Sequence, residues 1–182
     1  MSDPVAALGG ASFDGIFDGI ADIREIGPLG MITLRAKGLK GLDKAVKAAV
    51  GTKLPAQRRI EIAGDCACGW MSPDEYLLVL PYDQVAATLA GLATALAGQH
   101  HLAVDVSDAR AVFRIEGAGA DDVIRKLCPV DIDMLPEGEL RRTRAAQVPV
   151  AFWREGGGIT LVAFRSVARY VFDILVNSAR TK

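Results

Sequence analysis

Few side chains in this sequence have the type and spacing needed to bind a metal. Cys66 and Cys68 lie two residues apart on a predicted strand, and His100 and His101 are the only histidines. Structural zinc sites use closely spaced ligand pairs such as C-x-x-C or H-x-x-x-H, and neither spacing occurs here. The pattern therefore predicts reduced thiols buried in a strand and no metal site.

Sequence motifs of catalysis are also missing. There is no G-x-S-x-G, no P-loop, no dinucleotide-binding glycine pattern and no H-E-x-x-H. Gly117 and Gly119 lack the third glycine of a phosphate loop and are interpreted as a turn, and EGGGI (155–159) is interpreted as a hairpin loop. General acid–base chemistry near neutral pH would depend on the two histidines or on a carboxylate with a shifted pKa. We predict no catalytic residue in this chain.

Opposite charges gather at two places, and arginines gather at a third. The groups are Asp105 and Asp108 with Arg110, Asp121 and Asp122 with Arg125, and Arg141, Arg142 and Arg144. The first two are typical of solvated turns and helix caps. The arginines are typical of a strand with one solvent-exposed face. The alternative is a binding site for a polyanion, which the near-zero net charge of the chain does not favour.

Composition narrows the class of protein. Of 182 residues, 51% are hydrophobic and 24% charged, which indicates a folded chain. Lysine plus arginine is 21 and aspartate plus glutamate is 22, so neither nucleic acid nor an anionic membrane surface is an expected partner. No apolar stretch approaches the roughly 20 residues of a membrane span, and no signal sequence is recognised, so we expect a cytoplasmic location.

Residues 1–20 contain a tandem repeat, FDGIFDGI. Its apolar members have helical spacing and form a possible partner interface: Phe13, Ile16, Phe17 and Ile20. The glycines between them weaken a helix, so this is predicted to be a flexible apolar tail that orders against a partner. The alternative is a tail that packs on its own domain or stays disordered.

The remaining residues, 21–182, predict one domain of two similar halves, about 21–99 and 100–180. LRAKG (34–38) aligns with FRIEG (113–117), and YLLVL (76–80) with ITLVA (159–163). Strands are expected at 23–26, 31–36, 59–63, 67–71, 76–80, 102–106, 111–116, 140–144, 148–153 and 159–164. Helices are expected over 39–50, 83–97 with Asp83 as N-cap, 120–127 and 166–178.

The stretch GWMSPDEYLLVLP (69–81) places Trp70 and Met71 at the end of one predicted strand, before a turn and a second, strongly apolar strand. Ser72 to Glu75 suits a hairpin turn, and the unbroken apolar run after it predicts a strand covered on both faces. Trp70 and Met71 are residue types enriched in interface cores, which makes them candidates for a partner contact. The alternative is that Trp70 belongs to the ordinary domain core.

Three stretches together resemble the gamma subunit family of heterotetrameric sarcosine oxidase. They are WMSPDEYLLV (70–79), DVSDAR (105–110) and RRTRAAQVPVAFWR (141–154). The resemblance covers about residues 22–178. It implies an α+β fold with duplicated β2-α-β3-α halves, meaning two strands, a helix, three strands and a helix, similar to the folate-binding domain of aminomethyltransferases.

The resemblance also implies a function. The family belongs to a flavoenzyme complex that oxidises sarcosine with oxygen to glycine, hydrogen peroxide and a one-carbon unit passed to tetrahydrofolate. FAD, FMN, NAD and tetrahydrofolate are then expected in the other subunits and none in this chain, whose expected role is to brace the large alpha subunit. The alternatives are a stand-alone folate-binding, aminomethyltransferase-like protein and a homo-oligomer that pairs through its own strand edges.

Overall fold

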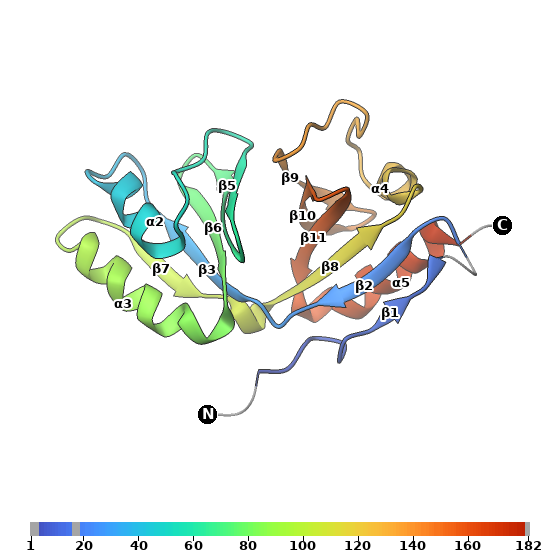
Figure 1. Cartoon of the computed structure of the whole chain (residues 1–182), viewed down its shortest axis with the longest axis horizontal. Coiled ribbons are helices and arrows are strands. Elements are labelled where there is room, and N and C mark those ends of the chain that lie inside the picture. Colours follow the sequence, from blue (N-terminus) through green and yellow to red (C-terminus); the bar gives the residue numbers. More distant parts are fainter. Residues whose placement is uncertain (1–3, 16–18, 181–182) are drawn as a thin grey trace. The chain divides into compact units, whose positions relative to one another are not determined.

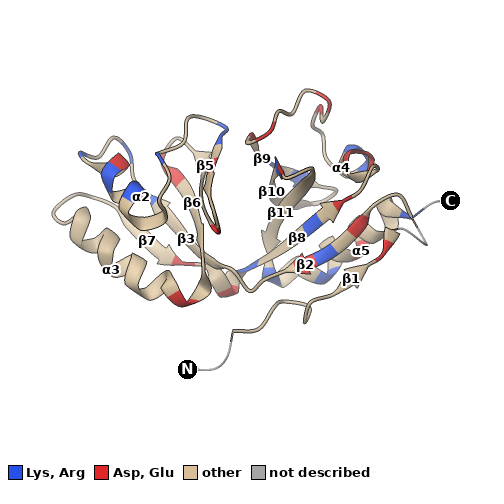
Figure 2. Cartoon of the chain, in the orientation of Figure 1, with Lys and Arg blue, Asp and Glu red and all other residues tan. Residues whose placement is uncertain are grey.

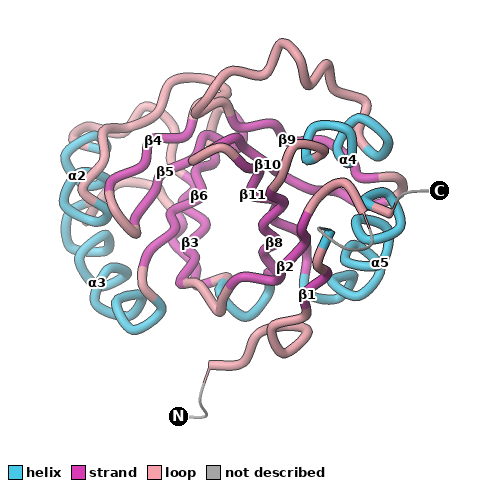
Figure 3. Tube along the Cα trace, turned by 45° about the vertical axis from the view of Figure 1, so that its right-hand side comes forward, coloured by secondary structure: helices cyan, strands magenta, loops and turns pink. Residues whose placement is uncertain are grey.

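The computed structural model describes residues 4–15 and 19–180. Two compact units make up the chain, and each is an antiparallel sheet with helices on one face (Figures 1 and 3). Unit 1 consists of the residues up to Pro28 together with those from Asp108 onward, and unit 2 of Leu29–Ser107. The α+β prediction is confirmed.

Unit 1 is built on a six-stranded sheet with the strand order β1-β2-β8-β11-β10-β9. The strands are β1 (Ser12–Phe13), β2 (Asp22–Ile26), β8 (Arg110–Glu116), β9 (Leu140–Ala145), β10 (Val148–Glu155) and β11 (Gly158–Phe164). In strand β8, Ala111, Phe113 and Ile115 belong to one core, while the residues between them, Val112 and Arg114, lie on the opposite face of the sheet. This alternation is the period expected of a strand with one face on the core.

Two helices cover that face of the unit 1 sheet: α4 (Ala120–Leu127) and α5 (Ala168–Ala179). Val123 and Ile124 of α4 and Val171 and Leu175 of α5 are fully buried against the sheet. Val123 and Ile124 follow the buried Ala120 by three and four residues, and Val171 and Leu175 are four apart, which is the apolar stripe of an amphipathic helix. The rings of Phe113 and Phe172 meet in this core with centroids 6.1 Å apart.

Unit 2 is built on a five-stranded sheet with the order β4-β5-β6-β3-β7. The strands are β3 (Gly30–Arg35), β4 (Ile60–Ala63), β5 (Cys66–Ser72), β6 (Glu75–Leu80) and β7 (Leu102–Asp105). Every residue of β6 is buried, which confirms the prediction drawn from its unbroken apolar run. Because β6 lies between β5 and β3, the backbone groups on both of its edges are paired within the sheet.

The helices of unit 2 are α2 (Leu42–Val50) and α3 (Val85–Ala95), and both pack on the face that carries Leu34 and Leu78. One local prediction is wrong here. Asp83 does not cap α3, because a 3-10 turn (Tyr82–Gln84) precedes the helix and Gln84 takes the cap position without a side-chain bond. The turn satisfies backbone groups that a capping side chain would otherwise bind.

Both predicted hairpin turns are present. Ser72 pairs with Glu75 across the β5–β6 turn, and Ser72 Oγ donates to Asp74 Oδ1 at 2.8 Å. In the β10–β11 hairpin, Gly156 and Gly157 have φ of 53° and 74°. Both values lie in the left-handed region required at the two central positions of a type I′ turn, which is where glycine costs least.

The duplication predicted from the sequence appears in the topology, with an exchange of strands. Each unit has the same order of sheet and helices, so β8 corresponds to β3, β11 to β6 and α4 to α2. However, β2 from the first half of the chain pairs with β8, and β7 from the second half pairs with β3. The compact units therefore do not follow the division at residues 99 and 100, and β2 and β3 form no hairpin with each other.

None of the helices in the described part of the chain has the length and apolar character of a membrane span.

Candidate functional site

The predicted contact residues Trp70 and Met71 lie near the end of β5, just before its hairpin turn. A register shift between Trp70 and Ser72 leaves Met71 at a bulge. Trp70 is half-buried and packs against the helix-side core of unit 2, while its backbone N–H donates to the carbonyl of Arg59 at 2.9 Å. This tryptophan therefore serves its own core in part and keeps part of its ring exposed.

Charged side chains hold the turn beside Trp70. The Arg35 guanidinium forms ion pairs with Asp74 at 3.2 Å and with Glu75 at 3.1 Å. The hydrogen bond from Ser72 lowers the pKa of Asp74, and the positive charge of Arg35 adds to that effect. The tip of the β5–β6 hairpin is thus a fixed, polar structure rather than a loose loop.

The predicted tail residues are tied to unit 1. We call residues 5–15 the strap. Phe13 pairs with Ile23 of β2 and packs with Ile20 against the core of unit 1, and the Arg180 guanidinium lies 5.8 Å from the Phe13 ring centre. The alternative of a tail packed on its own domain describes these two residues. Ile16 and Phe17 lie outside the described residues.

A buried carboxylate fixes the strap. Glu25 of β2 is only 8% exposed. It accepts hydrogen bonds from the backbone N–H of Leu8 at 3.0 and 3.1 Å and of Gly10 at 2.8 Å, and its own N–H donates to the Ala11 carbonyl at 2.7 Å. Arg165, in the turn just before α5, also contacts the strap: its guanidinium donates to the Val5 carbonyl at 2.9 Å. Glu25 was not predicted as a functional residue from the sequence, although a glutamate is rarely buried in a short strand such as DIREI (22–26).

A second buried charge that the sequence did not single out is Arg114, in the middle of β8. Its guanidinium donates to Thr160 Oγ1 at 3.1 Å, to the Glu155 carbonyl at 2.8 Å and to Glu116 at 3.1 Å. The hydrogen bond from Arg114, reinforced by Arg24, lowers the pKa of Glu116. Because Arg114 bonds both to β11 and to the end of β10, it braces the β10–β11 hairpin.

The charged groups identified in the sequence are only partly brought together. Arg125 pairs with Asp122 as expected, but Asp121 pairs instead with Arg154 at 2.7 Å. Asp105 accepts from Ser107, whereas the Arg110 guanidinium lies 4.3 Å from the centre of the Phe164 ring. These contacts are typical of structural ion pairs and turns.

Arg141, Arg142 and Arg144 lie on β9, the terminal strand of the unit 1 sheet. Arg142 and Arg144 are exposed, and Arg141, on the other face, pairs with Glu139 at 2.6 Å. Alternating exposure along this strand confirms the prediction of one wet face.

The thiols and imidazoles do not converge. Cys66, Cys68 and Cys128 are free; burial raises the pKa of the Cys68 thiol well above its usual value, and burial raises the pKa of Cys128 to about 12. The thiols of Cys68 and Cys128 therefore remain protonated and unreactive near neutral pH. His100 is exposed, and a ring nitrogen of His101 lies 2.9 Å from the Gln99 carbonyl. Within residues 4–15 and 19–180, no cluster of three or more potential metal ligands was found.

The glycine pair after β8 forms the turn that the sequence predicted. The N–H of Gly119 donates to the Ile20 carbonyl at 2.9 Å. A Cβ atom at Gly119 would come within 2.5 Å of the Ile20 Cβ, so glycine is required for close packing of the chain at this joint. Gly117 and Gly119 therefore connect β8 to α4 at a point where the backbone of Ile20 packs closely against the turn.

The duplicated topology places the chain in a known class of fold. A structure of aminomethyltransferase T of the glycine cleavage system from Bartonella henselae matches with a TM-score of 0.64 over 87% of this chain and 46% of that one, at 14% identity. The fold is therefore aminomethyltransferase-like.

Closer relatives define the family. A family model described as sarcosine oxidase, gamma subunit family, matches residues 39–180. A sarcosine oxidase subunit gamma from Arthrobacter sp. is 35% identical over 159 residues, which is 84% of this chain and 76% of the relative. A chain in the heterotetrameric sarcosine oxidase of Corynebacterium sp. matches with a TM-score of 0.79 and 28% identity, covering 87% of this chain and 83% of that chain. This chain belongs to the sarcosine oxidase gamma subunit family.

Proposed function

We propose that this chain is a structural subunit of a sarcosine oxidase complex and is not catalytic by itself. The observation that carries this proposal is the family match, which extends from the first helix of unit 2 to the end of α5 in unit 1. A match of that extent includes most of both cores, although not β1, β2 and β3, so it is much more than one shared motif. Partners would be the other oxidase subunits, chiefly the large alpha subunit.

The reaction proposed for the complex is the oxidative demethylation of sarcosine to glycine, with formation of hydrogen peroxide and transfer of the one-carbon unit to tetrahydrofolate. In this proposal FAD, FMN, NAD and tetrahydrofolate bind to other subunits. Support for a bracing role comes from how this chain uses its own polar groups. Glu25 and Arg114 are each bonded within unit 1, and the thiol pKa values of Cys68 and Cys128 are raised by burial.

Co-expression with the other subunits tests the assignment. We expect this chain to co-purify with flavin-bearing chains through size-exclusion chromatography, and the isolated chain to show no oxygen consumption with sarcosine. Omitting this chain is expected to reduce the yield of assembled complex, because a bracing subunit acts on assembly. Sarcosine turnover by the purified chain alone would contradict the proposal.

A second candidate is a stand-alone folate-binding protein, which the aminomethyltransferase-like fold favours. Shared fold does not transfer activity, so a direct measurement is needed. Isothermal titration of the isolated chain with a reduced folate separates the two candidates. Saturable binding in the micromolar range supports the stand-alone protein, and no heat of binding supports the structural subunit. Light scattering on the same sample tests the homo-oligomer alternative.

A further inference from the structure

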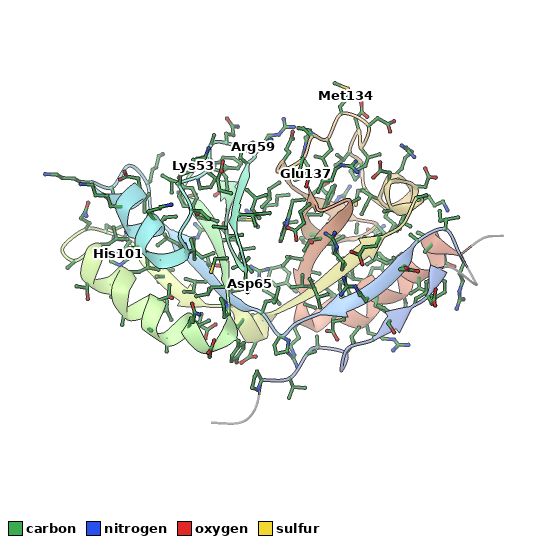
Figure 4. All side chains as sticks on the ribbon, in the orientation of Figure 1. Lys53, Arg59, Asp65, His101, Met134 and Glu137 are labelled. Carbon is green, nitrogen blue, oxygen red and sulfur yellow. The ribbon has the colours of Figure 1, made fainter. Side chains whose placement is uncertain are left out.

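The loop between α4 and β9, residues 128–139, presents a bare hydrophobic side chain. Met134 is 73% exposed. It lies at the outer end of the loop, with its side chain directed away from the ribbon (Figure 4). A methionine is flexible and polarizable, so it adapts well to a partner's pocket. Met134 therefore offers an exposed, adaptable apolar side chain at the end of this loop.

The loop is anchored on both sides of Met134. Ile132 is 1% exposed and Leu135 4% exposed, and both belong to the core of unit 1. The Arg154 guanidinium donates to the backbone carbonyls of these two residues at 3.2 Å each, and to Asp121 of α4 at 2.7 Å. Because Ile132 and Leu135 are both buried in the core, the loop backbone between them leaves the Met134 side chain pointing outward.

Further bonds fix the ends of the loop. The backbone N–H of Gly156 donates to Glu137 Oε1 at 2.9 Å, and the N–H of Gly138 donates to the Arg154 carbonyl at 3.2 Å. Asp133 pairs with Arg125 of α4 at 2.7 Å. A loop held in this way has already lost the conformational freedom that a binding site must otherwise give up, so docking through it is favoured.

The charge of the loop indicates the chemistry of its partner. Residues 128–139 contain Asp131, Asp133, Glu137 and Glu139 but no lysine or arginine (Figure 2). Glu139 is buried, while Asp131, Asp133 and Glu137 are exposed, and Asp133 is next to Met134 in the sequence. Interfaces combine a desolvated apolar centre with a polar rim of complementary charge. The matching surface is thus an apolar pocket with lysine or arginine at its rim.

We propose that the α4–β9 loop is a docking element, and that Met134 inserts into an apolar, basic-rimmed pocket on another subunit of the same oxidase complex. The inference rests on the proposed function, because that function supplies the partner. It assigns the contact to unit 1 and to a residue outside the segments that the sequence singled out, namely the N-terminal repeat and Trp70–Met71.

Substitution at the loop provides the first test. Full-length chains carrying Met134→Asp are mixed with the remaining subunits, and the dissociation constant is measured by biolayer interferometry. We expect at least a tenfold weaker association with an unchanged melting temperature, because the side chain makes no contribution to the core. Tyr170→Asp, at another exposed hydrophobic residue (41%), is the matched control and is expected to bind like the wild type.

A charge-reversal pair tests the rim. Asp131→Lys is expected to weaken association and to reduce its sensitivity to salt, because it removes an attraction that salt screens. Asp83→Lys, an exposed aspartate in unit 2, is the control and is expected to have no such effect. Equal loss in both variants would mean that net charge alone acts, and would contradict a localised rim.

Methionine oxidation gives a readout that needs no substitution. Dilute hydrogen peroxide oxidises exposed methionines to sulfoxides, which mass spectrometry counts by position. In the free chain Met134 is expected to react quickly and Met31, 1% exposed, slowly. In the complex Met134 is expected to be protected at least fivefold. Protection of Met71 with Met134 still reactive would move the contact to β5 and overturn the inference.

The outcomes separate the two proposals. If the wild-type chain does not bind the other subunits, the proposed function and the docking loop both fail. If it binds and Met134→Asp binds equally well, only the docking loop fails. If light scattering shows the isolated chain as a dimer that Met134→Asp converts to a monomer, the occupant of the loop is a second copy, and the proposed partner is wrong.

Discussion

Arg114 and Glu116 show how single side chains stabilise the unit 1 sheet in a pH-dependent way. Glu116 has its pKa lowered from 4.5 in the fold by the Arg114 hydrogen bond and then by Arg24. A lowered pKa means that the ionised form favours the folded state. The stabilisation is therefore complete above the unfolded pKa and is lost as the pH falls through the folded pKa.

The substitution Glu116→Gln tests this assignment. We expect the free energy of unfolding to fall by less than about 1 kcal/mol at pH 7, since solvent screens a partly exposed ion pair. The difference between variant and wild type should shrink as the pH drops below 4.5. Urea unfolding of both proteins at several pH values measures this difference in the free energy of unfolding. A difference that grows toward acid pH would contradict the sign.

Trp70 can now be tested as a core residue that is only half-buried. We expect Trp70→Ala to lower the free energy of unfolding by about 1–2 kcal/mol, less than the about 2–5 kcal/mol expected for Leu78→Ala, which empties a fully buried site in the same unit. Thermal unfolding measures both variants. Unchanged melting of Trp70→Ala together with lost assembly would assign Trp70 to an interface instead.

At the scale of elements, the strap is the clearest departure from the sequence-based expectation. An apolar tail that serves only a neighbour can be deleted with little effect on melting. Here β1 pairs with β2, and Glu25 accepts bonds from two strap residues, so the strap covers what would otherwise be the edge strand of the sheet. Covered edges resist unwanted pairing with other chains.

Deleting residues 1–15 is therefore expected to lower the melting temperature and to promote association of the isolated chain. Glu25→Gln, which keeps the shape of the side chain but removes its charge, should cost about 1–3 kcal/mol because buried hydrogen bonds to a charged group are strong. Calorimetry and light scattering measure these effects. Ser12→Ala, at an exposed strap residue outside the Glu25 contacts, serves as the control. Unchanged melting on deletion would show that the strap contributes nothing to unit 1.

For the whole molecule, the exchange of β2 and β7 decides which pieces of the chain can fold. Unit 2 is the continuous segment Leu29–Ser107, and it contains every strand of its sheet. A fragment of residues 29–107 is expected to show a cooperative melting transition by circular dichroism. A fragment of residues 21–99, cut according to the sequence halves, lacks β7 and carries β2 without its partner β8. We expect it to melt at a lower temperature or without cooperativity, and equal stability of the two fragments would contradict the exchange.

The parts of the fold that could be predicted are those that depend on the pattern of residues close together in the sequence. The strand at 76–80, the hairpin turn at 72–75 and the helix at 120–127 depend on neighbouring residues, and each appears within a residue or so of its predicted bounds. The N-cap at Asp83 failed, because a capping side chain competes with other local ways to satisfy the backbone, and here a 3-10 turn does so.

The candidate site was less predictable, because contact residues are chosen by what lies across space. Nothing adjacent in the sequence indicates that Glu25 binds the backbone of residues 8 and 10, or that Arg154 fixes the α4–β9 loop. Met134 looks like an ordinary apolar residue among Ile132 and Leu135 until the structure shows which of the three faces outward. Its exposure is a property of the folded loop.

The sequence by itself determined the elements, the duplication and the family resemblance, since these depend on short-range periodicity and on residues that are close along the chain. Only the tertiary structure decided which sheet receives β2 and β7, which residues hold the strap and which methionine is bare. The physical reason is that strand pairing and burial depend on contacts between residues far apart in sequence. Two strands with similar patterns fit either sheet until the connections and the packing of the whole chain select one.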